Sequence, residues 1–136
     1  MHGDSMEQEL INQLLALPGE TIHLEKGEFL FHEGDIADHF FIVREGRLSI
    51  KKFEASGHIF AHRLVGPNNV LGEIPLYETN TRTYVFNAIA REKCSVYSIR
   101  YDVLEPAIAK DHSLAIAMMK IYTLHMRRQQ AKYRDL

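Results

Sequence analysis

Two charged residues stand out in the sequence, Glu73 in a Leu71–Tyr77 segment and Arg82 nine positions later. Gly72 lets the backbone approach a ligand closely, and Glu73 offers a carboxylate at the mouth of a predicted short helix over 74–78. Arg82 offers a guanidinium whose planar fork can pair with two phosphate oxygens, and we expect it to open the next strand and turn back over this helix. A carboxylate can accept a hydrogen bond from a sugar hydroxyl. The pattern therefore fits a ligand with one phosphate charge and a free hydroxyl.

Each of these residues also has an ordinary structural explanation. A Gly-Glu pair is common, and Glu73 can simply favour a helix N-terminus. An arginine at the start of a strand is usually a solvated surface group. The combination is more specific than its parts, because both residues lie between two predicted strands of a region punctuated by glycine.

The surrounding sequence predicts a mainly β protein with flanking helices. Short alternating runs broken by glycine predict strands at 21–24, 28–32, 40–45, 47–53, 58–65, 82–90 and 95–100. Many short strands with regular turn signals are typical of a sandwich or barrel. We therefore expect a jelly-roll-like β-roll over residues 21–100.

Helical patterns frame the roll and complete a single domain over residues 6–136. A short N-terminal helix is predicted over 6–17, with Ser5 and Gln8 as a capping box and Pro18-Gly19 as its end. Met6 is the expected native start. The C-terminal helices span 101–134, as one short helix over 101–109 and a longer one over 112–134 that Asp111 caps. No glycine or proline closes the last helix, so we expect the chain to continue into a further domain.

The last helix carries an apolar seam at alternating spacings of three and four, formed by Leu114, Ala117, Ile121 and Leu124. This spacing is typical of a helix that pairs with a partner helix. We therefore expect a homodimer through the C-terminal helix, and packing on the chain's own roll is the alternative.

Composition excludes several classes of protein. The chain has 16 basic and 18 acidic residues, so no strong global field attracts nucleic acid or an anionic membrane. The single cysteine, Cys94, cannot form an internal disulfide or hold an iron–sulfur cluster of four thiolates. No apolar run approaches the ~20 residues that span a bilayer. We expect a cytoplasmic protein with no membrane partner, and no nucleic-acid contact from this chain alone.

The eight histidines do not predict a metal site. His58 and His62 are separated by ~13 Å if they lie on one strand, and no carboxylate-rich ligand set accompanies the others. His125 is more consistent with a polar member of the helix seam than with a haem ligand. A metal enzyme on a cupin-type roll would need a His-x-His pair with a downstream carboxylate, and nothing resembles a nucleophile–base pair. We therefore expect a binding module with no cofactor and no enzymatic activity.

Two stretches of the chain resemble the cyclic-nucleotide-binding domains of catabolite activator proteins, cyclic-nucleotide-dependent kinases and gated channels. Residues 26–50 resemble the family signature of turn glycines, aspartates and aromatics. Residues 71–90 resemble its phosphate-binding cassette, G-E-L-A-L followed by P-R-[AST]-A. The positions that match the cassette are Gly72, Glu73, Leu76, Arg82 and Ala88.

The resemblance implies that Arg82 binds the cyclic phosphate, Glu73 the ribose hydroxyl, and Thr83 a position near phosphate and base. The implied ligand site comprises Leu71, Gly72, Glu73, Ile74, Pro75, Arg82 and Thr83, with Gln129 and Gln130 as base contacts from the last helix. The implied ligand is cyclic AMP, with cyclic GMP as a second candidate, and the implied parent is a bacterial transcription regulator. A sensor of haem or another small molecule on the same fold is the alternative.

Four residues depart from the family pattern. Pro75 lacks an N–H that could donate to the phosphate, and Thr81 replaces the proline before the arginine. Tyr84 is bulky where alanine is usual, and Asn68 replaces a frequent turn glycine but tolerates positive φ. These departures bear on ligand affinity more than on ligand class.

Overall fold

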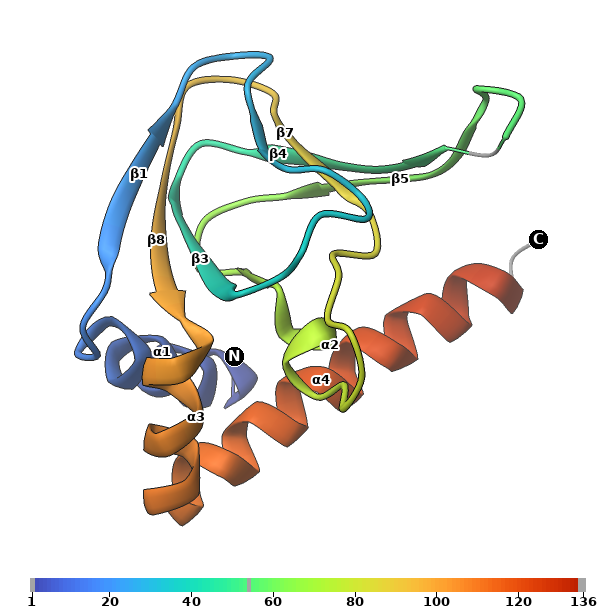
Figure 1. Ribbon diagram of the computed structural model, residues 1–136. Helices are drawn as coiled ribbons and strands as arrows, with labels where there is room; N and C mark the ends of the chain where they lie inside the picture. The colour runs from blue at the N-terminus through green and yellow to red at the C-terminus, as the bar shows by residue number, and fades with distance from the viewer. Residues whose placement is uncertain (1, 54, 135–136) are drawn as a thin grey trace.

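The computed structural model describes residues 2–53 and 55–134, with side chains for 8–53, 55–58, 62–124 and 126–127. Its strands form two four-stranded antiparallel sheets (Figure 1). The first sheet has the order β1 (Glu20–Leu24), β8 (Cys94–Arg100), β3 (His39–Glu45) and β6 (Val70–Leu71). The second has the order β2 (Phe29–Phe31), β7 (Asn87–Ala90), β4 (Leu48–Phe53) and β5 (Ile59–Val65). The predicted β-roll with flanking helices is confirmed.

Six of the seven predicted strands match the structure to within one residue at each end, but the strand predicted over 82–90 begins only at Asn87. Residues 82–84 pair with the loop 34–37 rather than with a strand, and residues 85–86 form a bend before β7. Gly34 N–H donates to Tyr84 O at 2.8 Å, and Ala37 N–H donates to Arg82 O at 2.9 Å. Arg82 therefore lies in a loop, and the expectation that it opens a strand is wrong. The two-residue strand β6 was not predicted, because it follows directly on a turn-rich segment.

Four helices accompany the sheets: α1 (His2–Leu15), α2 (Glu73–Leu76), α3 (Tyr101–Lys110) and α4 (His112–Arg134). The N-terminal helix begins before the predicted start at residue 6 and ends two residues before 17, at Leu15. The predicted capping box is therefore wrong, because Ser5 lies inside the helix. Asp111 does cap α4 as predicted: its Oδ1 accepts from Leu114 N–H at 3.2 Å, and this bond lowers the pKa of its carboxyl group.

The core lies between the two sheets and extends beneath them into the helices. Phe40, Ile42 and Leu48 of the roll are fully buried, and Leu104 of α3 is equally inaccessible. Leu114, the first residue of the predicted seam, is only 3% exposed and belongs to the same core. Burial of a leucine side chain contributes about 1.5–3 kcal/mol. Ala117 and Ile121 of the seam are partly buried against the same core, so most of the seam packs on its own chain, and the pairing with a second chain remains a prediction.

Figure 1 shows α4 passing below the roll, with α1 and α3 beside its first half and α2 above its middle. α1 and α3 both pack against α4. None of the described helices has the length and apolar character needed to cross a membrane. The arrangement brings α2, α3 and α4 together at one end of the roll, where the cassette segment lies.

Candidate functional site

The cassette segment leaves β6 at Leu71 and turns sharply at Gly72 before α2 begins. Gly72 has φ 87°, in the left-handed region, and it occupies the N-cap position of α2. A Cβ atom at this position would lie 2.7 Å from the backbone oxygen of His39. Only glycine therefore satisfies both the backbone angle and the close approach to β3.

Glu73 follows at the first position of α2 and is buried, with 6% of its surface exposed. A charged carboxylate is costly to bury without polar partners. Its position beside Gly72, in the wall of a pocket, is where the sequence predicted a ligand-binding carboxylate. The structure thus places the Glu73 carboxylate at the inner edge of the cassette.

Arg82 lies in the loop between α2 and β7 and extends toward α3. Its Nη1 donates to Glu105 Oε1 at 2.6 Å, and its Nε donates to the carbonyl oxygen of Glu78 at 3.2 Å. The bond to Glu105 raises the pKa of Arg82 above its ordinary value. The guanidinium therefore stays charged, and α3 holds it next to the cassette.

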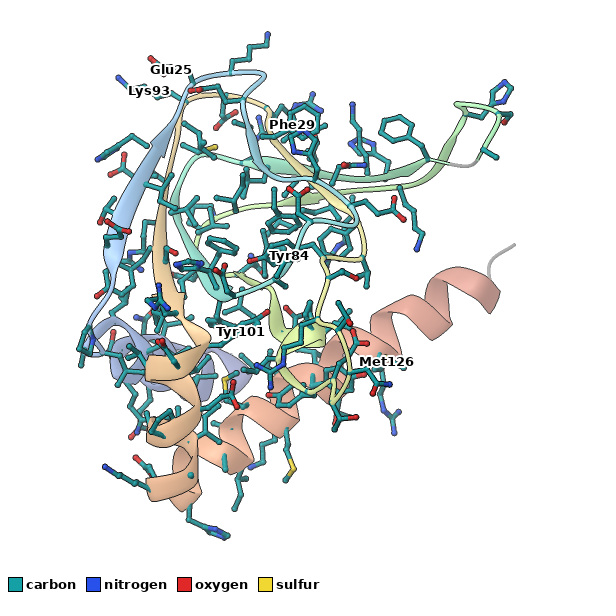
Figure 2. All side chains as sticks on the ribbon, viewed as in Figure 1. Glu25, Phe29, Tyr84, Lys93, Tyr101 and Met126 are labelled. Carbon is teal, nitrogen blue, oxygen red and sulfur yellow. The ribbon has the colours of Figure 1, made fainter. Side chains whose placement is uncertain are left out.

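Tyr101 connects the arginine to the glycine turn. Its ring lies under the Arg82 guanidinium, with 5.4 Å between Cζ and the ring centroid. Its hydroxyl donates to Gly72 O at 2.5 Å. The residue is 3% exposed, and burial raises the pKa of its hydroxyl. Tyr101 is thus the side chain through which Arg82 and the Gly72 turn are held together. Figure 2 labels Tyr101 at the end of the roll where α2 and α3 lie.

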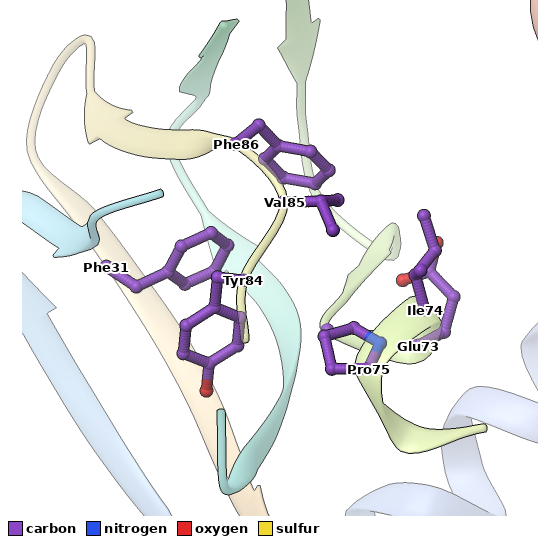
Figure 3. Close-up of a pocket in the computed structure, with 8 residues that line it drawn as sticks. Phe31, Glu73, Ile74, Pro75, Tyr84, Val85 and Phe86 are labelled. Carbon is purple, nitrogen blue, oxygen red and sulfur yellow. The ribbon is translucent and has the colours of Figure 1, made fainter. Parts of the chain in front are cut away.

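A small pocket lies between α2 and the loop that leads into β7 (Figure 3). Its lining residues are Phe31, Gly72, Glu73, Ile74, Pro75, Tyr84, Val85 and Phe86. Aromatic and aliphatic groups make up most of this wall. The side chain of Arg82 does not line the pocket, because it extends toward α3 instead.

Tyr84 fills the side of the pocket that faces the roll. Its ring stacks on Phe31 with 4.0 Å between centroids. Its hydroxyl donates to His39 O at 3.1 Å and accepts from His39 N–H at 3.2 Å. Burial raises the pKa of Tyr84 to about 12. The ring is therefore fixed by stacking at one end and by two hydrogen bonds at the other.

The remaining predicted site residues fall into three groups. Ile74 and Pro75 line the pocket with Glu73. Thr83 is half-buried and forms an isolated backbone bridge with Ile36, outside the pocket wall. Gln129 and Gln130 belong to α4, but their side chains lie outside the described residues, as does that of His125. No group of three or more potential metal ligands occurs among the residues that the structure describes.

Sequence reasoning missed two residues at the site, Tyr101 and Glu105. Both lie on α3, more than twenty positions after the groups they contact, Gly72 and Arg82. Nothing local in the sequence marks them, because only the packing of α3 against the roll brings them to the cassette. Tyr84 was noted as bulky, but its stacking on Phe31 depends on the pairing of loop 34–37 with residues 82–84.

Comparison with known proteins places this geometry in a family. The family described as "Cyclic nucleotide-binding domain" matches residues 21–111, from the first strand to the end of α3. The chain belongs to the cyclic nucleotide-binding domain family. The matched region includes the Gly72 turn, Glu73, Arg82 and Glu105.

The curated relatives of this cyclic nucleotide-binding domain include regulatory proteins. The "Anaerobic regulatory protein" of Bacillus subtilis is 29% identical over 113 residues, which is 83% of this chain and 47% of that protein. The "CRP-like cAMP-activated global transcriptional regulator" of Mycobacterium tuberculosis is 21% identical over 117 residues, covering 86% of this chain and 51% of the relative. The chain therefore spans about half the length of these two relatives. Both are named as regulators, which agrees with the expectation of a non-enzymatic module.

Solved structures share the fold of the cyclic nucleotide-binding domain. A transcriptional regulator from Thermotoga maritima has a TM-score of 0.78 at 24% identity, covering 90% of this chain and 94% of its own. The catabolite activator protein of Thermus thermophilus has a TM-score of 0.78 at 17% identity, with 93% and 58% covered. The sensor domain of the regulator DNR from Pseudomonas aeruginosa has a TM-score of 0.74 at 18% identity, with 96% and 95% covered. These structures establish the β-roll architecture.

Proposed function

We propose that this chain is the sensory module of a longer bacterial transcription regulator, and that its ligand is cyclic AMP or cyclic GMP. The single observation that supports this most is the junction at Tyr101, which holds a charged arginine next to the Gly72–Glu73 turn in a member of the cyclic nucleotide-binding domain family. Transcription regulators act where the DNA lies, so we propose a cytoplasmic location.

Arg82 is the residue proposed to bind the cyclic phosphate. Its guanidinium is a planar fork of N–H donors that can hold two phosphate oxygens at once. With 29% of the side chain exposed, an anion can reach it from solvent. Because α2 has only four residues and Pro75 has no N–H, the backbone of the cassette offers few donors. Most of the attraction for the phosphate must therefore come from Arg82.

Glu73 is proposed to accept a hydrogen bond from the ribose 2′-hydroxyl. It lies in the pocket wall next to Ile74 and Pro75, at the same end of the roll as Arg82. A hydrogen bond from a ligand hydroxyl to this buried carboxylate would contribute about 0.5–1.5 kcal/mol, or more because the acceptor is charged, and an analogue without the hydroxyl loses it. The proposal therefore predicts that a 2′-deoxy cyclic nucleotide binds less tightly than its ribose counterpart.

Ligand entry requires a rearrangement at Tyr84. The pocket between Tyr84 and Pro75 is small and open only in part, whereas a purine nucleotide needs a cleft of roughly 300 Å³ or more. Arg82 points away from this pocket, so the cassette loop must also turn inward for one ligand to meet both Arg82 and Glu73.

A second candidate function is the sensing of a different small molecule on the same fold. The observation in its favour is the closed aromatic wall formed by Phe31, Tyr84 and Phe86, which suits a compact apolar ligand better than a nucleotide. Haem is the member of this class that is simplest to test, since an absorption spectrum of the purified protein reports it directly.

Calorimetric titration of the 136-residue chain with cyclic AMP, cyclic GMP and 5′-AMP tests the main proposal. We expect saturable binding of one cyclic nucleotide per chain and much weaker binding of 5′-AMP, whose phosphate is not tied back to the sugar. A chain that binds neither cyclic nucleotide, or that binds 5′-AMP equally well, contradicts the proposal. A visible absorption band in the purified protein supports the second candidate instead.

A further inference from the structure

Glu105, on α3, occupies the donor group of Arg82 that a phosphate would need. Its Oε1 lies 2.6 Å from Arg82 Nη1, and the arginine Nε is used by the carbonyl oxygen of Glu78 at 3.2 Å. Both residues remain accessible, with side-chain exposures of 29% for Arg82 and 46% for Glu105. Two of the three guanidinium nitrogens, Nη1 and Nε, are therefore engaged by groups of the protein itself.

A carboxylate and a phosphate compete for the same N–H donors. Each is an anion whose oxygens accept hydrogen bonds from a guanidinium, and charge-assisted bonds of this kind are among the stronger hydrogen bonds in proteins. One Nη1–H of Arg82 cannot donate a full-strength hydrogen bond to Glu105 and to a ligand at the same time. A phosphate that approaches the Nη1 edge of the guanidinium must therefore replace or weaken the contact with Glu105.

We propose that Glu105 is a built-in competitor for the ligand's phosphate, which lowers the affinity of the site and links ligand entry to the position of α3. This inference rests on the proposed function, because it assumes that Arg82 binds a cyclic phosphate. Glu105 is a residue that sets affinity through Arg82, and it is not itself a ligand contact.

The packing of α3 explains how release of Glu105 would be transmitted. Leu104, the residue before Glu105, is fully buried in the core and anchors α3 to the roll. A shift of Glu105 therefore changes how α3 packs there. α3 packs against α4, and in the sequence only Asp111 lies between the two helices. The cassette also contacts α4 directly through Tyr77, whose ring meets Tyr122 edge-on at 5.6 Å. The cassette thus touches both helices that lead toward the end of the chain.

Thermodynamic linkage makes this coupling reciprocal. If the ligand displaces Glu105 and loosens α3 from the cassette loop, then anything that holds α3 against the loop lowers the affinity for the ligand by the same factor. Removal of the negative charge at Glu105 relieves the competition. The Arg82–Glu105 pair is partly exposed, so its interaction free energy is that of an accessible ion pair. Its removal should therefore raise the affinity for the ligand about two- to fivefold.

Calorimetric titration with cyclic AMP and cyclic GMP tests this inference on three forms of the chain: the unaltered protein, Glu105→Gln and Asp102→Asn. Asp102 is the matched control, because it is an exposed acid on the same helix that pairs with Arg100 at 2.9 Å and not with Arg82. We expect Glu105→Gln to bind the preferred nucleotide about two- to fivefold more tightly at low salt. Asp102→Asn should bind it as the unaltered chain does. Thermal unfolding without ligand should show that Glu105→Gln is no more stable than the unaltered chain.

Each outcome decides the matter. An unchanged or weaker affinity in Glu105→Gln, with the unaltered chain binding normally, overturns the competitor and leaves the proposed function intact. An equal gain in Asp102→Asn also overturns it, because a general loss of negative charge then explains the effect. Binding by Glu105→Gln alone supports a strong competitor. Absence of binding in all three forms overturns the proposed function and the inference with it.

Discussion

The hydroxyl of Tyr101 donates a 2.5 Å hydrogen bond to the carbonyl oxygen of Gly72, and so joins the first turn of α3 to the turn before α2. The two residues are 29 positions apart in the sequence. The same ring lies under Arg82, so one side chain contacts both parts of the proposed phosphate site. The geometry of the cassette therefore depends on a residue outside the cassette.

Tyr101→Phe should separate the hydrogen bond from the packing of the ring. The substitution leaves the ring under Arg82 but leaves the Gly72 carbonyl without its donor, at a cost of about 1–3 kcal/mol in the free energy of unfolding. We also expect a severalfold loss of nucleotide affinity, because the Gly72 turn is held less firmly. Urea unfolding and calorimetric titration measure the two effects.

Tyr97→Phe is the matched control for this substitution. The Tyr97 hydroxyl donates to Leu17 O at 2.6 Å, and neither residue belongs to the cassette, so its loss should lower stability by a similar amount and leave nucleotide affinity unchanged. Equal effects of both variants on affinity would mean that Tyr101 acts only through general stability.

Arg82→Ala should cost roughly 2–4 kcal/mol of nucleotide binding, the scale expected when one partner of a close charge pair is removed. Arg82→Lys should recover only part of the loss, because an ammonium group lacks the planar fork. Arg100→Ala is the control, since that arginine is exposed and its guanidinium pairs with Asp102. Unchanged affinity in Arg82→Ala, measured by calorimetry, would remove the basis for the site.

The roll itself could be predicted from the sequence, because alternation of apolar and polar residues has the same period as a strand. Asp111 could also be predicted as a helix cap, since capping depends on a residue and its next few neighbours. The strand predicted from residue 82 is wrong at its beginning. Residues 82–84 pair their backbone groups with loop 34–37, and residues 85–86 form a bend, so β7 begins only at Asn87.

The chemistry of the site was predictable only where it is local. Gly72 and Glu73 are adjacent, and Arg82 follows in the next loop, so their types and spacing identify the cassette. Tyr101 and Glu105 reach it through the packing of α3, and a single sequence contains no signal for that contact. The sequence does predict that Arg82 turns back toward residues 74–78, and its Nε donates to Glu78 O, but its contacts with Tyr101 and Glu105 were beyond prediction.

Tyr84→Ala should enlarge the pocket and raise nucleotide affinity. The ring stacks on Phe31 and occupies space next to Glu73 and Pro75 that a ligand would otherwise fill. Its removal should also lower the free energy of unfolding by about 3–5 kcal/mol, as for other buried aromatic residues. Calorimetry and urea unfolding report both quantities on one sample.

Tyr84→Phe distinguishes the ring from its hydroxyl. It keeps the stacking and the filled volume but removes the two hydrogen bonds to His39. We expect its affinity to stay close to that of the unaltered chain. If Tyr84→Ala instead binds nucleotide more weakly than both, the ring is a ligand contact and not an obstacle.

The chain should associate as a homodimer through α4. Because Leu114 is buried in its own core, the partner must contact the exposed side of the helix, where Met119 is 60% exposed and Met126 is 44% exposed. Met119→Lys should weaken association, whereas Met119→Leu should preserve it, since leucine keeps an apolar side chain of similar size. Sedimentation velocity at micromolar concentration, with and without nucleotide, is the measurement. A monomer under both conditions would show that α4 packs only on its own chain.

Thr83 should influence the choice between cyclic GMP and cyclic AMP. It follows Arg82 directly and is half-buried, and we expect its hydroxyl to lie close to the phosphate when the ligand is bound. In the syn conformation, guanine can bring its 2-amino group toward this region, and a hydroxyl can accept from it. Adenine has no such group, although Gln129 or Gln130 would favour adenine if α4 closes over the base.

The expected preference between the two nucleotides is modest. One neutral hydrogen bond contributes about 0.5–1.5 kcal/mol, or tenfold at most, so we expect both to bind with a preference no greater than about thirtyfold. Thr83→Ala should weaken cyclic GMP selectively and leave cyclic AMP nearly unchanged, and Thr83→Ser, which keeps the hydroxyl, should restore cyclic GMP binding. Calorimetric titration of each variant with both nucleotides gives the comparison. If Thr83→Ala weakens both nucleotides equally, the hydroxyl serves the phosphate, and base selection must arise elsewhere in the site.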